Sequence, residues 1–277
     1  MSGSDKEIFG REGHLVARAL FDAEEVGRLR DHYMDLRRRG PHPHDLAGTR
    51  VAGRDPLRRY PRMAQMHRWD ETTLRWLLDS RLRDRLTALL GQEPYAVQSM
   101  LYFKPPGSRG QALHQDNFYL RAEPGTCVAA WMALDPTDED NGCMMVVPGS
   151  QDWPILCTAK ADTRVSFTDV TVPLPDAHTA LPVRMAPGDV LFFNGSLVHG
   201  SMPNTSADRF RRALIGHYIQ GDARQVAEYF HPALRMDGTP LRLGVSEGGG
   251  PCGEWADADG VPAIAMTGRH TITRRHE

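Results

Sequence analysis

A histidine and an aspartate lie two positions apart in the segment ALHQDNFYL, residues 112–120. The surrounding residues are apolar and aromatic, which is typical of a strand. Side chains two apart on a strand point to the same face of a sheet, so His114 and Asp116 can bind one metal ion together. A third ligand would complete a facial triad, a set of three ligands that leaves the opposite coordination positions open.

The candidate for the third ligand is His199, which follows an apolar strand and a turn in PGDVLFFNGSLVHGS. It lies 85 residues after His114 (199 minus 114), but strands so far apart can become neighbours in a closed β core. An H-x-D pair alone is weak evidence, because a surface histidine beside a capping aspartate has the same pattern. Among the other histidines, His42 and His44 lie in a proline-flanked loop. His217 lies in an apolar strand, where a hydrogen-bonded core histidine is expected.

Two helices are predicted upstream of this segment. Residues 21–40 have an N-cap in Asp22, acidic residues after it and a closing glycine. Residues 70–91 predict a second helix or a helix pair, because leucines recur at helical spacing and Gly91 follows them.

From Gln92 onward, short apolar runs are separated by Gly, Pro and Asn, which is typical of many short strands in a sandwich or barrel. The last segment is expected to be irregular, since three successive glycines in VSEGGGPCGEW oppose both helix and strand. No linker is visible. We therefore expect one domain over residues 1–277, with N-terminal helices over about 1–91, a β core over about 92–222 and an irregular segment over about 223–277.

The composition is that of an ordinary globular protein, with 40% hydrophobic and 25% charged residues in 277. The formal net charge of −2 argues against a nucleic-acid partner. No apolar run approaches the roughly 18 residues that a membrane helix needs, and the first ten residues lack the apolar core of a signal peptide. These features predict a cytoplasmic protein without membrane contact, and they say nothing of its oligomeric state.

The four cysteines are Cys127, Cys143, Cys157 and Cys252. None of them forms a C-x-x-C pair, which argues against a cysteine zinc site. We expect reduced thiols that fill space, as is usual in a cytoplasm.

Several stretches, in order along the chain, resemble the phytanoyl-CoA dioxygenase family of iron(II)- and 2-oxoglutarate-dependent oxygenases. They are QSMLYFKPPGS, LHQD, AAWMALDPTDEDNGCMMVVPGS, PGDVLFFNGSLVHGS and PNTSADRFRRALIGHY. The resemblance implies a mainly β fold with flanking helices, built on a double-stranded β-helix or jelly roll. It implies His114, Asp116 and His199 as Fe(II) ligands. 2-Oxoglutarate and O2 would fill the open positions, and decarboxylation to succinate would generate the oxidant.

The distal carboxylate of 2-oxoglutarate needs a buried cation, and a guanidinium suits it because it pairs bidentately and keeps its charge. The family places this arginine on the strand after the distal histidine. Arg211 in FRRAL matches the family's Phe-Arg-x-Ala pattern, twelve residues after His199. Arg209 and Arg212 remain alternatives, because Arg209 would share a strand face with Arg211.

The resemblance suggests three further cosubstrate contacts, each with a structural alternative. Gln98 supplies an amide or is a strand-edge polar residue. Trp131 walls the pocket or is a core tryptophan. Ser201 donates a hydroxyl or is a turn serine. Asn141 and Gly142 are expected to form a structural turn.

Two positions set this chain apart from relatives. The family's PGSH ends here in Gln151, which should matter little for iron. Related halogenases carry a small residue in place of the triad aspartate, so Asp116 argues for hydroxylation or a related oxidation and against halogenation.

The leading prediction is a dioxygenase that hydroxylates a small organic molecule. The same iron chemistry could also give epimerisation, desaturation or ring closure. A non-catalytic ligand-binding relative and a zinc-dependent hydrolase are alternatives, but the intact triad speaks against the first, and the second would not need Arg211. The excess of Arg and Gly over Lys favours a high-GC bacterium and tailoring of a secondary metabolite, although an acyl-CoA substrate stays open. Pocket walls are expected from residues 41–62, the stretch after Asp116, residues 158–179 and the C-terminal tail. Part of 41–62 or of 158–179 is expected to order on substrate binding.

Overall fold

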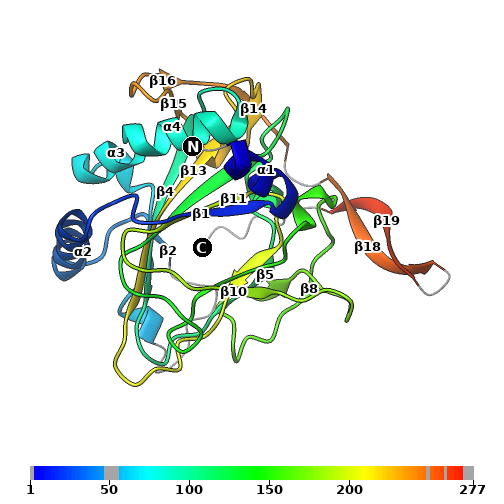
Figure 1. Ribbon diagram of the computed structural model, residues 1–277, viewed down its shortest axis with the longest axis horizontal. Coiled ribbons are helices and arrows are strands. Elements are labelled where there is room, and N and C mark those ends of the chain that lie inside the picture. Colours follow the sequence, from blue (N-terminus) through cyan, green and yellow to red (C-terminus); the bar gives the residue numbers. More distant parts are fainter. Residues whose placement is uncertain (1–2, 47–55, 248–249, 259–260, 271–277) are drawn as a thin grey trace.

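The computed structural model describes residues 3–46, 56–247, 250–258 and 261–270. Two antiparallel sheets form the body, and helices lie over the larger sheet (Figure 1). The α-helices are α1 (Gly3–Glu12), α2 (Ala23–Arg38), α3 (Glu71–Leu77), α4 (Ser80–Leu90) and α5 (Asn117–Leu120). Short 3-10 turns are η1 (Pro56–Arg58), η2 (Met66–Arg68), η3 (Ser150–Asp152) and η4 (Glu228–Phe230).

The larger sheet has the strand order β1-β11-β6-β13-β4-β15-β16, and β2 joins it through β3, which pairs with β4. Its strands are β1 (His14–Ala17), β2 (Asp45–Leu46), β3 (Arg62–Ala64), β4 (Tyr95–Lys104), β6 (Cys127–Ala133), β11 (Val190–Asn194), β13 (Arg211–Ile219), β15 (Ala233–Leu234) and β16 (Pro240–Leu241). The smaller sheet has the order β10-β7-β12-β5. Its strands are β5 (Gln111–His114), β7 (Met144–Val146), β10 (Leu181–Val183) and β12 (His199–Ser201).

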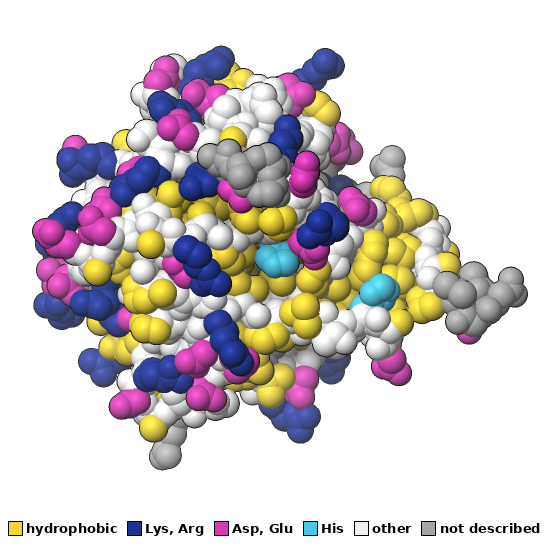
Figure 2. Space-filling model, in the orientation of Figure 1, with side chains coloured by type: hydrophobic (Ala, Val, Ile, Leu, Met, Phe, Trp, Pro, Cys, Tyr) yellow, Lys and Arg dark blue, Asp and Glu magenta, His cyan; other side chains and the backbone are white. Residues whose placement is uncertain are grey.

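Three separate pairs complete the described strands. They are β8 (Ala159–Lys160) with β9 (Val170–Thr171), β14 (Gln225–Val226) with β17 (Gly244–Val245), and β18 (Gly250–Ala258) with β19 (Val261–His270). The β18–β19 hairpin projects from the body (Figure 1), and its visible surface is largely hydrophobic (Figure 2). Within β18, Trp255 packs edge-on against Trp153, with ring centroids 5.0 Å apart.

Strand alternation divides the apolar residues of the larger sheet between two cores. In β6, Ala129, Trp131 and Ala133 belong to the core shared with the smaller sheet. The alternate residues Val128, Ala130 and Met132 pack in a second core with α3 and α4. The second core includes Trp76, Leu77, Leu82, Leu86 and Leu89. Two facing sheets around one apolar core are the predicted jelly roll, and the helices hold its larger sheet rigid from behind.

The predicted helices are confirmed. Asp22 caps α2 through a capping box with Glu25, in which each side chain accepts a hydrogen bond from the other residue's backbone N–H. The segment 70–91 forms the pair α3 and α4, whose N-caps are Asp70 and Asp79. Gly91 ends α4 with a φ of +82°, which favours glycine.

The N-terminal third holds more than helices. α1 was not predicted, and β1 forms one edge of the larger sheet, with His14 opposite Phe193. β2 and β3 add to the other side. Short edge strands are missed because their pairing partners lie far away in sequence. The predicted loop 41–62 is described only over residues 41–46 and 56–62, because residues 47–55 lie outside the described residues.

The expectation of an irregular C-terminal segment is wrong for the described residues. Residues 225–270 hold the strands β14 to β19, and β18 begins at Gly250, inside the glycine-rich stretch. The regular pairing of β18 with β19 outweighs the poor strand propensity of glycine.

The expectation of four reduced cysteines is also wrong in part. Cys157 and Cys252 form a disulfide across a sequence separation of 95, a pairing that spacing alone cannot reveal. The disulfide links β18 to the loop before β8. The prediction that all four cysteines are reduced, as is usual in a cytoplasm, therefore no longer supports that location. Cys127 and Cys143 are free and buried, as expected. In the described part of the chain, no helix combines the length and apolar character needed to cross a membrane.

Candidate metal and cosubstrate site

The three predicted metal ligands converge at the open end of the smaller sheet. His114 ends β5 and His199 begins β12, and the two residues are directly opposite in register. Asp116 Oδ1 lies 3.4 Å from His114 Nε2 and 3.6 Å from His199 Nε2. One ligand atom from each residue lies within 4.8 Å of the other two. This spacing allows a single ion to bind all three.

The backbone reaches this arrangement by a different route from the one that the sequence suggested. Asp116 is not on the strand: it follows the end of β5 and has helical backbone angles, φ −63° and ψ −35°, as α5 begins. The turn into α5, rather than strand alternation, brings its carboxylate beside His114.

Hydrogen bonds fix which ring nitrogens face the centre. His114 Nδ1 donates to the carbonyl of Ala112 at 2.9 Å, and His199 Nδ1 donates to that of Leu197 at 3.0 Å. A carbonyl only accepts, so each Nδ1 carries the proton and each Nε2 presents a lone pair. The amide nitrogen of Gln111 lies 3.1 Å from His114 Nε2 and donates to that lone pair.

The charges at the centre also suit a metal. Burial, followed by repulsion from His114, lowers the pKa of His199 to about 4, so this imidazole is neutral near pH 7. Burial alone would raise the pKa of Asp116. The nearby imidazoles of His199, His114 and His217 outweigh burial and hold that pKa well below its ordinary value. A neutral imidazole and an ionised carboxylate are the forms that bind metal.

His217 was interpreted as a core histidine, and the structure gives it a more specific contact. Its Nε2 donates to Asp116 Oδ2 at 3.1 Å, which leaves Oδ1 directed at the two ligand histidines. His217 shares the inner face of β13 with Arg211, Ala213 and Ile215. The two-residue spacing of these positions was the signal in the sequence that could have placed His217 on the same strand face as Arg211.

A cavity of about 450 Å³ opens onto the triad. The cosubstrate candidates Gln98, Trp131, Ser201 and Arg211 all line it. Arg211 is only 1% exposed. Its Nε donates to the carbonyl of Gly142 at 3.1 Å, its Nη1 is buried without a hydrogen-bond partner, and its guanidinium carbon lies 5.3 Å from the Trp131 ring centroid. Burial lowers the pKa of Arg211 to about 10, which leaves it charged near neutral pH.

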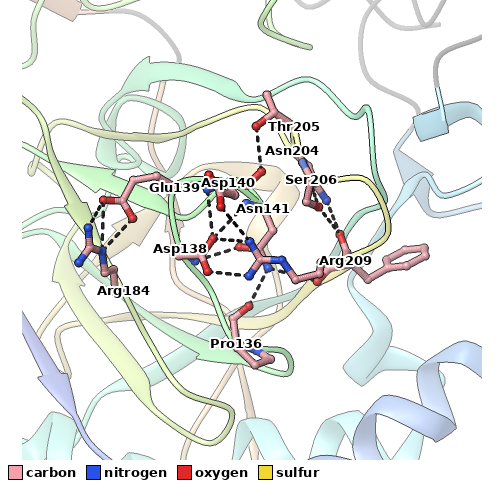
Figure 3. A network of polar contacts seen from close by, with 11 residues as sticks. Pro136, Asp138, Glu139, Asp140, Asn141, Arg184, Asn204, Thr205, Ser206 and Arg209 are labelled. Atoms are coloured by element: carbon pink, nitrogen blue, oxygen red, sulfur yellow. Dashed lines mark hydrogen bonds and ion pairs between the residues drawn. The ribbon is translucent and has the colours of Figure 1, made fainter.

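The two alternative arginines are engaged elsewhere. Arg209 pairs with Asp138 at 2.6 Å on the surface (Figure 3). Arg212 forms a two-pronged pair with Asp135, at 2.6 and 2.7 Å. Neither lines the cavity, so Arg211 is the one of the three with a free donor facing the triad.

The family assignment rests on the sequence model of phytanoyl-CoA dioxygenase (PhyH), which matches residues 9–213. This chain belongs to the phytanoyl-CoA dioxygenase family. The resemblance inferred from the motifs is thereby confirmed.

A relative within the family is rice (Oryza sativa subsp. japonica) phytanoyl-CoA dioxygenase 1. It is 30% identical over 155 residues, which are 56% of this chain and 55% of that protein. The match therefore spans little more than half of the rice protein.

Two solved structures are similar to this chain in fold. One is the epimerase SnoN in complex with Fe3+, alpha ketoglutarate and nogalamycin RO, with a TM-score of 0.66 at 18% identity over 95% of this chain and 97% of that one. The other is EctD from S. alaskensis with 2-oxoglutarate and 5-hydroxyectoine, with a TM-score of 0.62 at 25% identity over 81% and 78%. Both agree with the predicted fold class.

A buried lysine next to the family's arginine position was not predicted. Lys104 is 2% exposed, and its Nζ donates to Ser201 Oγ at 2.8 Å and to the backbone of Met202 and Gly142. Burial, then repulsion from Arg211, lowers the pKa of Lys104 well below its ordinary value. Ser201 Oγ accepts this bond and one from the backbone N–H of Gln111 at 3.2 Å. Its own proton remains available for a ligand.

The turn at Asn141 and Gly142 has the structural role that was predicted for it. Asn141 accepts from the N–H of Asp138 at 2.9 Å and donates to the carbonyl of Pro136 at 2.7 Å (Figure 3). Gly142 has a φ of +84°, and a Cβ there would lie 2.5 Å from the carbonyl oxygen of Met202. The turn therefore requires glycine, and it directs the Gly142 carbonyl at the Arg211 guanidinium.

The remaining predicted positions have simple placements. Gln98 is buried and lines the cavity together with Tyr229. Gln151, in place of the family's histidine, donates to the carbonyls of Gly10 and Arg11 at the end of α1. It does not line the cavity.

Proposed function

We propose that this protein is an Fe(II)- and 2-oxoglutarate-dependent dioxygenase that hydroxylates a small organic molecule, with residues 1–277 acting as one oxygenase domain. One observation carries the proposal. A buried His-Asp-His cluster and a buried arginine with an unpartnered donor face the same cavity. Two neutral imidazoles and one carboxylate suit Fe(II) and leave positions open for a chelating cosubstrate and O2.

In this proposal His114, Asp116 and His199 would hold the iron. His217 hydrogen-bonds Asp116 Oδ2 and leaves Oδ1 as the oxygen that faces the two ligand histidines. When bound, iron and 2-oxoglutarate supply the activation of O2, coupling decarboxylation to succinate and CO2 with oxidation of the substrate.

Arg211 pairs with the distal carboxylate of 2-oxoglutarate, and its Nη1 is the donor kept for that purpose. Ser201 adds a hydroxyl beside it, and Trp131 supports the guanidinium from the ring face. Gln98 lies on the same wall, where its amide adds a polar contact. The Gly142 carbonyl fixes the orientation of the guanidinium before the cosubstrate arrives, which lowers the entropy lost on binding.

Hydroxylation or a related oxidation is favoured over halogenation because Asp116 is present as a third ligand. The same residues could support epimerisation, desaturation or ring closure, since these outcomes differ in how the substrate lies beside the iron. We propose tailoring of a bacterial secondary metabolite in the cytoplasm as the setting. The epimerase SnoN, whose structure was solved in complex with nogalamycin RO, is similar to this chain in fold. That similarity supports the proposed setting.

Succinate formation from 2-oxoglutarate, measured with Fe(II) added and with Fe(II) withheld, tests the proposal. An oxygenase forms succinate in an iron-dependent way. A non-catalytic relative binds 2-oxoglutarate and forms none, and a zinc hydrolase is indifferent to 2-oxoglutarate. Either of the last two results would refute the proposed function.

A further inference from the structure

Two more arginines line the cavity, and the proposed iron and cosubstrate sites use neither. They are Arg62 on β3 and Arg121 at the end of α5. Arg62 Nη1 donates to the Tyr102 hydroxyl at 3.4 Å, and its guanidinium carbon lies 4.9 Å from the Phe167 ring centroid. In the described part of the chain, neither arginine forms an ion pair with a carboxylate.

Arg121 is held in place by its backbone. It closes α5 in the left-handed region with a φ of +49°, and its N–H donates to the carbonyl of Asn117. Its Nε is buried without a hydrogen-bond partner. Burial lowers the pKa of Arg121, and the nearby carboxylate of Glu123 opposes that shift. Glu123 accepts a hydrogen bond from the Gln225 side chain and none from Arg121. The guanidinium thus keeps unused donors.

The wall beside Arg121 carries another unused donor. The N–H of Ala227 donates to the carbonyl of Leu120 at 2.9 Å, and that of Ser246 donates to the carbonyl of Val226 at 3.1 Å. These bonds bring Ser246 to the same side of the cavity. Ser246 is 5% exposed and lines the cavity, and its Oγ has no hydrogen-bond partner.

The cavity therefore holds more positive charge than its proposed contents neutralise. Among the described lining residues, the positive side chains are Arg62, Arg121 and Arg211, and the one carboxylate is Asp116. Fe(II) brings two positive charges and 2-oxoglutarate brings two negative ones. Two positive charges remain unbalanced by the groups that line or fill the cavity, and a half-buried guanidinium whose donors lack an acidic partner is costly.

We propose that the substrate carries an anionic group, a carboxylate or a phosphate ester, that pairs with Arg62 and Arg121. The inference rests on the proposed function, because it takes the cavity as the substrate site. The apolar body of the substrate lies against side chains such as Met100, Phe193, Ile215 and Phe230, which line the same cavity. Substrates that differ only in lacking this negative charge are rejected.

Calorimetric titration of simple probes tests the proposal. The probes are 2-naphthoate and 2-naphthyl phosphate, with neutral 2-naphthamide as the matched control. They are titrated into the full-length protein under nitrogen, with Fe(II) and 2-oxoglutarate bound and again without either. The anionic probes should bind at least about tenfold more tightly than the amide, since a charge-assisted pair gives roughly 1.4 kcal/mol or more.

Variants assign the effect to residues. Arg62→Gln and Arg121→Gln should each remove most of the preference for the anion, and Arg62→Lys and Arg121→Lys should keep part of it. Arg75→Gln is the control, because Arg75 is exposed on α3 and pairs only with Glu71 among the described residues. Affinity for 2-oxoglutarate should stay unchanged in all of these variants.

Equal binding of the amide and the anions would overturn the proposal. Loss of anion binding in Arg211→Gln, with binding kept in the Arg62 and Arg121 variants, would also overturn it. The probe would then occupy the cosubstrate site. Failure of the proposed function is seen separately, as absence of 2-oxoglutarate binding in the wild-type protein. The probe titration without cosubstrate still reports on Arg62 and Arg121 in that case.

Discussion

Replacing Arg211 with alanine perturbs the proposed cosubstrate anchor where the structure is most specific. The guanidinium is 1% exposed, uses Nε on the Gly142 carbonyl and keeps Nη1 free. Removing one partner of a buried charge pair costs about 3–5 kcal/mol, because the other charge is left uncompensated. At ~1.4 kcal/mol per tenfold, the affinity for 2-oxoglutarate should fall roughly a hundred- to a few thousand-fold.

The assay is succinate formation over a range of 2-oxoglutarate concentrations, beside a direct titration of Fe(II). The apparent KM for 2-oxoglutarate should rise steeply in Arg211→Ala, while iron affinity stays near the wild-type value. Arg211→Lys should recover only part of the loss, because an ammonium keeps the charge without the planar fork.

Arg209→Ala and Arg212→Ala are the matched controls, since these arginines are paired with Asp138 and Asp135 and do not line the cavity. Neither should change the KM for 2-oxoglutarate by more than about threefold, well below the ~1.4 kcal/mol of a tenfold change. If one of them gives the largest shift, that arginine is the anchor. If all three shifts stay under about threefold, the carboxylate is held elsewhere.

The remaining predictions concern the metal, the disulfide, a buried histidine and a loop. Three variants test the metal ligands: His114→Ala, Asp116→Ala and His199→Ala. Each should abolish turnover while circular dichroism shows a folded protein. A variant that keeps normal activity and iron content shows that its residue is not a ligand. Cys157→Ser should lower the free energy of unfolding by about 2–5 kcal/mol, because the disulfide closes a long loop; denaturant titration yielding an unchanged value would count against it. Burial, followed by repulsion from Arg68, lowers the pKa of His67 to about 4, whereas the unfolded chain takes up its proton near 6.5. Stability should therefore fall by about 1.6 kcal/mol from pH 6.5 to 5 through this residue, and His67→Gln should lose that share of the slope; an equal slope in both proteins would contradict it. Residues 158–179, which include the cavity-lining Thr168, should be cut more slowly by protease when cosubstrate and substrate are bound, and equal rates would count against a lid.

Local signals in the sequence were enough for much of the scaffold. Asp22 followed by Glu25 predicts the capping box that starts α2, and Gly91 predicts the end of α4. The continuous apolar run CVAAWMA predicts a short strand, and every residue of it is buried. These signals depend on neighbours within a few residues, which is why they could be read directly.

The triad could be predicted because the family motif records a long-range contact that spacing alone does not. His114 of the H-x-D pair and the distal His199 lie directly opposite each other across β5 and β12. The strand argument for Asp116 failed in detail, since the chain turns into α5 before that residue. His217 and Lys104 were missed as contacts of the site, because nothing local shows which buried polar side chain reaches which partner.

The second pair of cavity arginines shows the same limit. Arg62 reaches the cavity through the pairing of β3 with β4, and Arg121 is joined to the C-terminal segment by the Leu120–Ala227 hydrogen bond. The disulfide between Cys157 and Cys252 also depends on a contact across much of the chain. Charge, burial and free donors could be weighed only once these distant segments had been placed together.

Anaerobic addition of 2-oxoglutarate to the Fe(II)-loaded protein tests the central claim most directly. A 2-oxo acid that chelates Fe(II) through its keto and carboxylate oxygens gives a visible metal-to-ligand charge-transfer absorption. We predict that the wild-type protein develops this absorption with one iron and one 2-oxoglutarate per chain, and that His114→Ala and His199→Ala do not. Wild-type protein that binds iron without developing the absorption, or either variant that develops it at full strength, would contradict the assignment of this site.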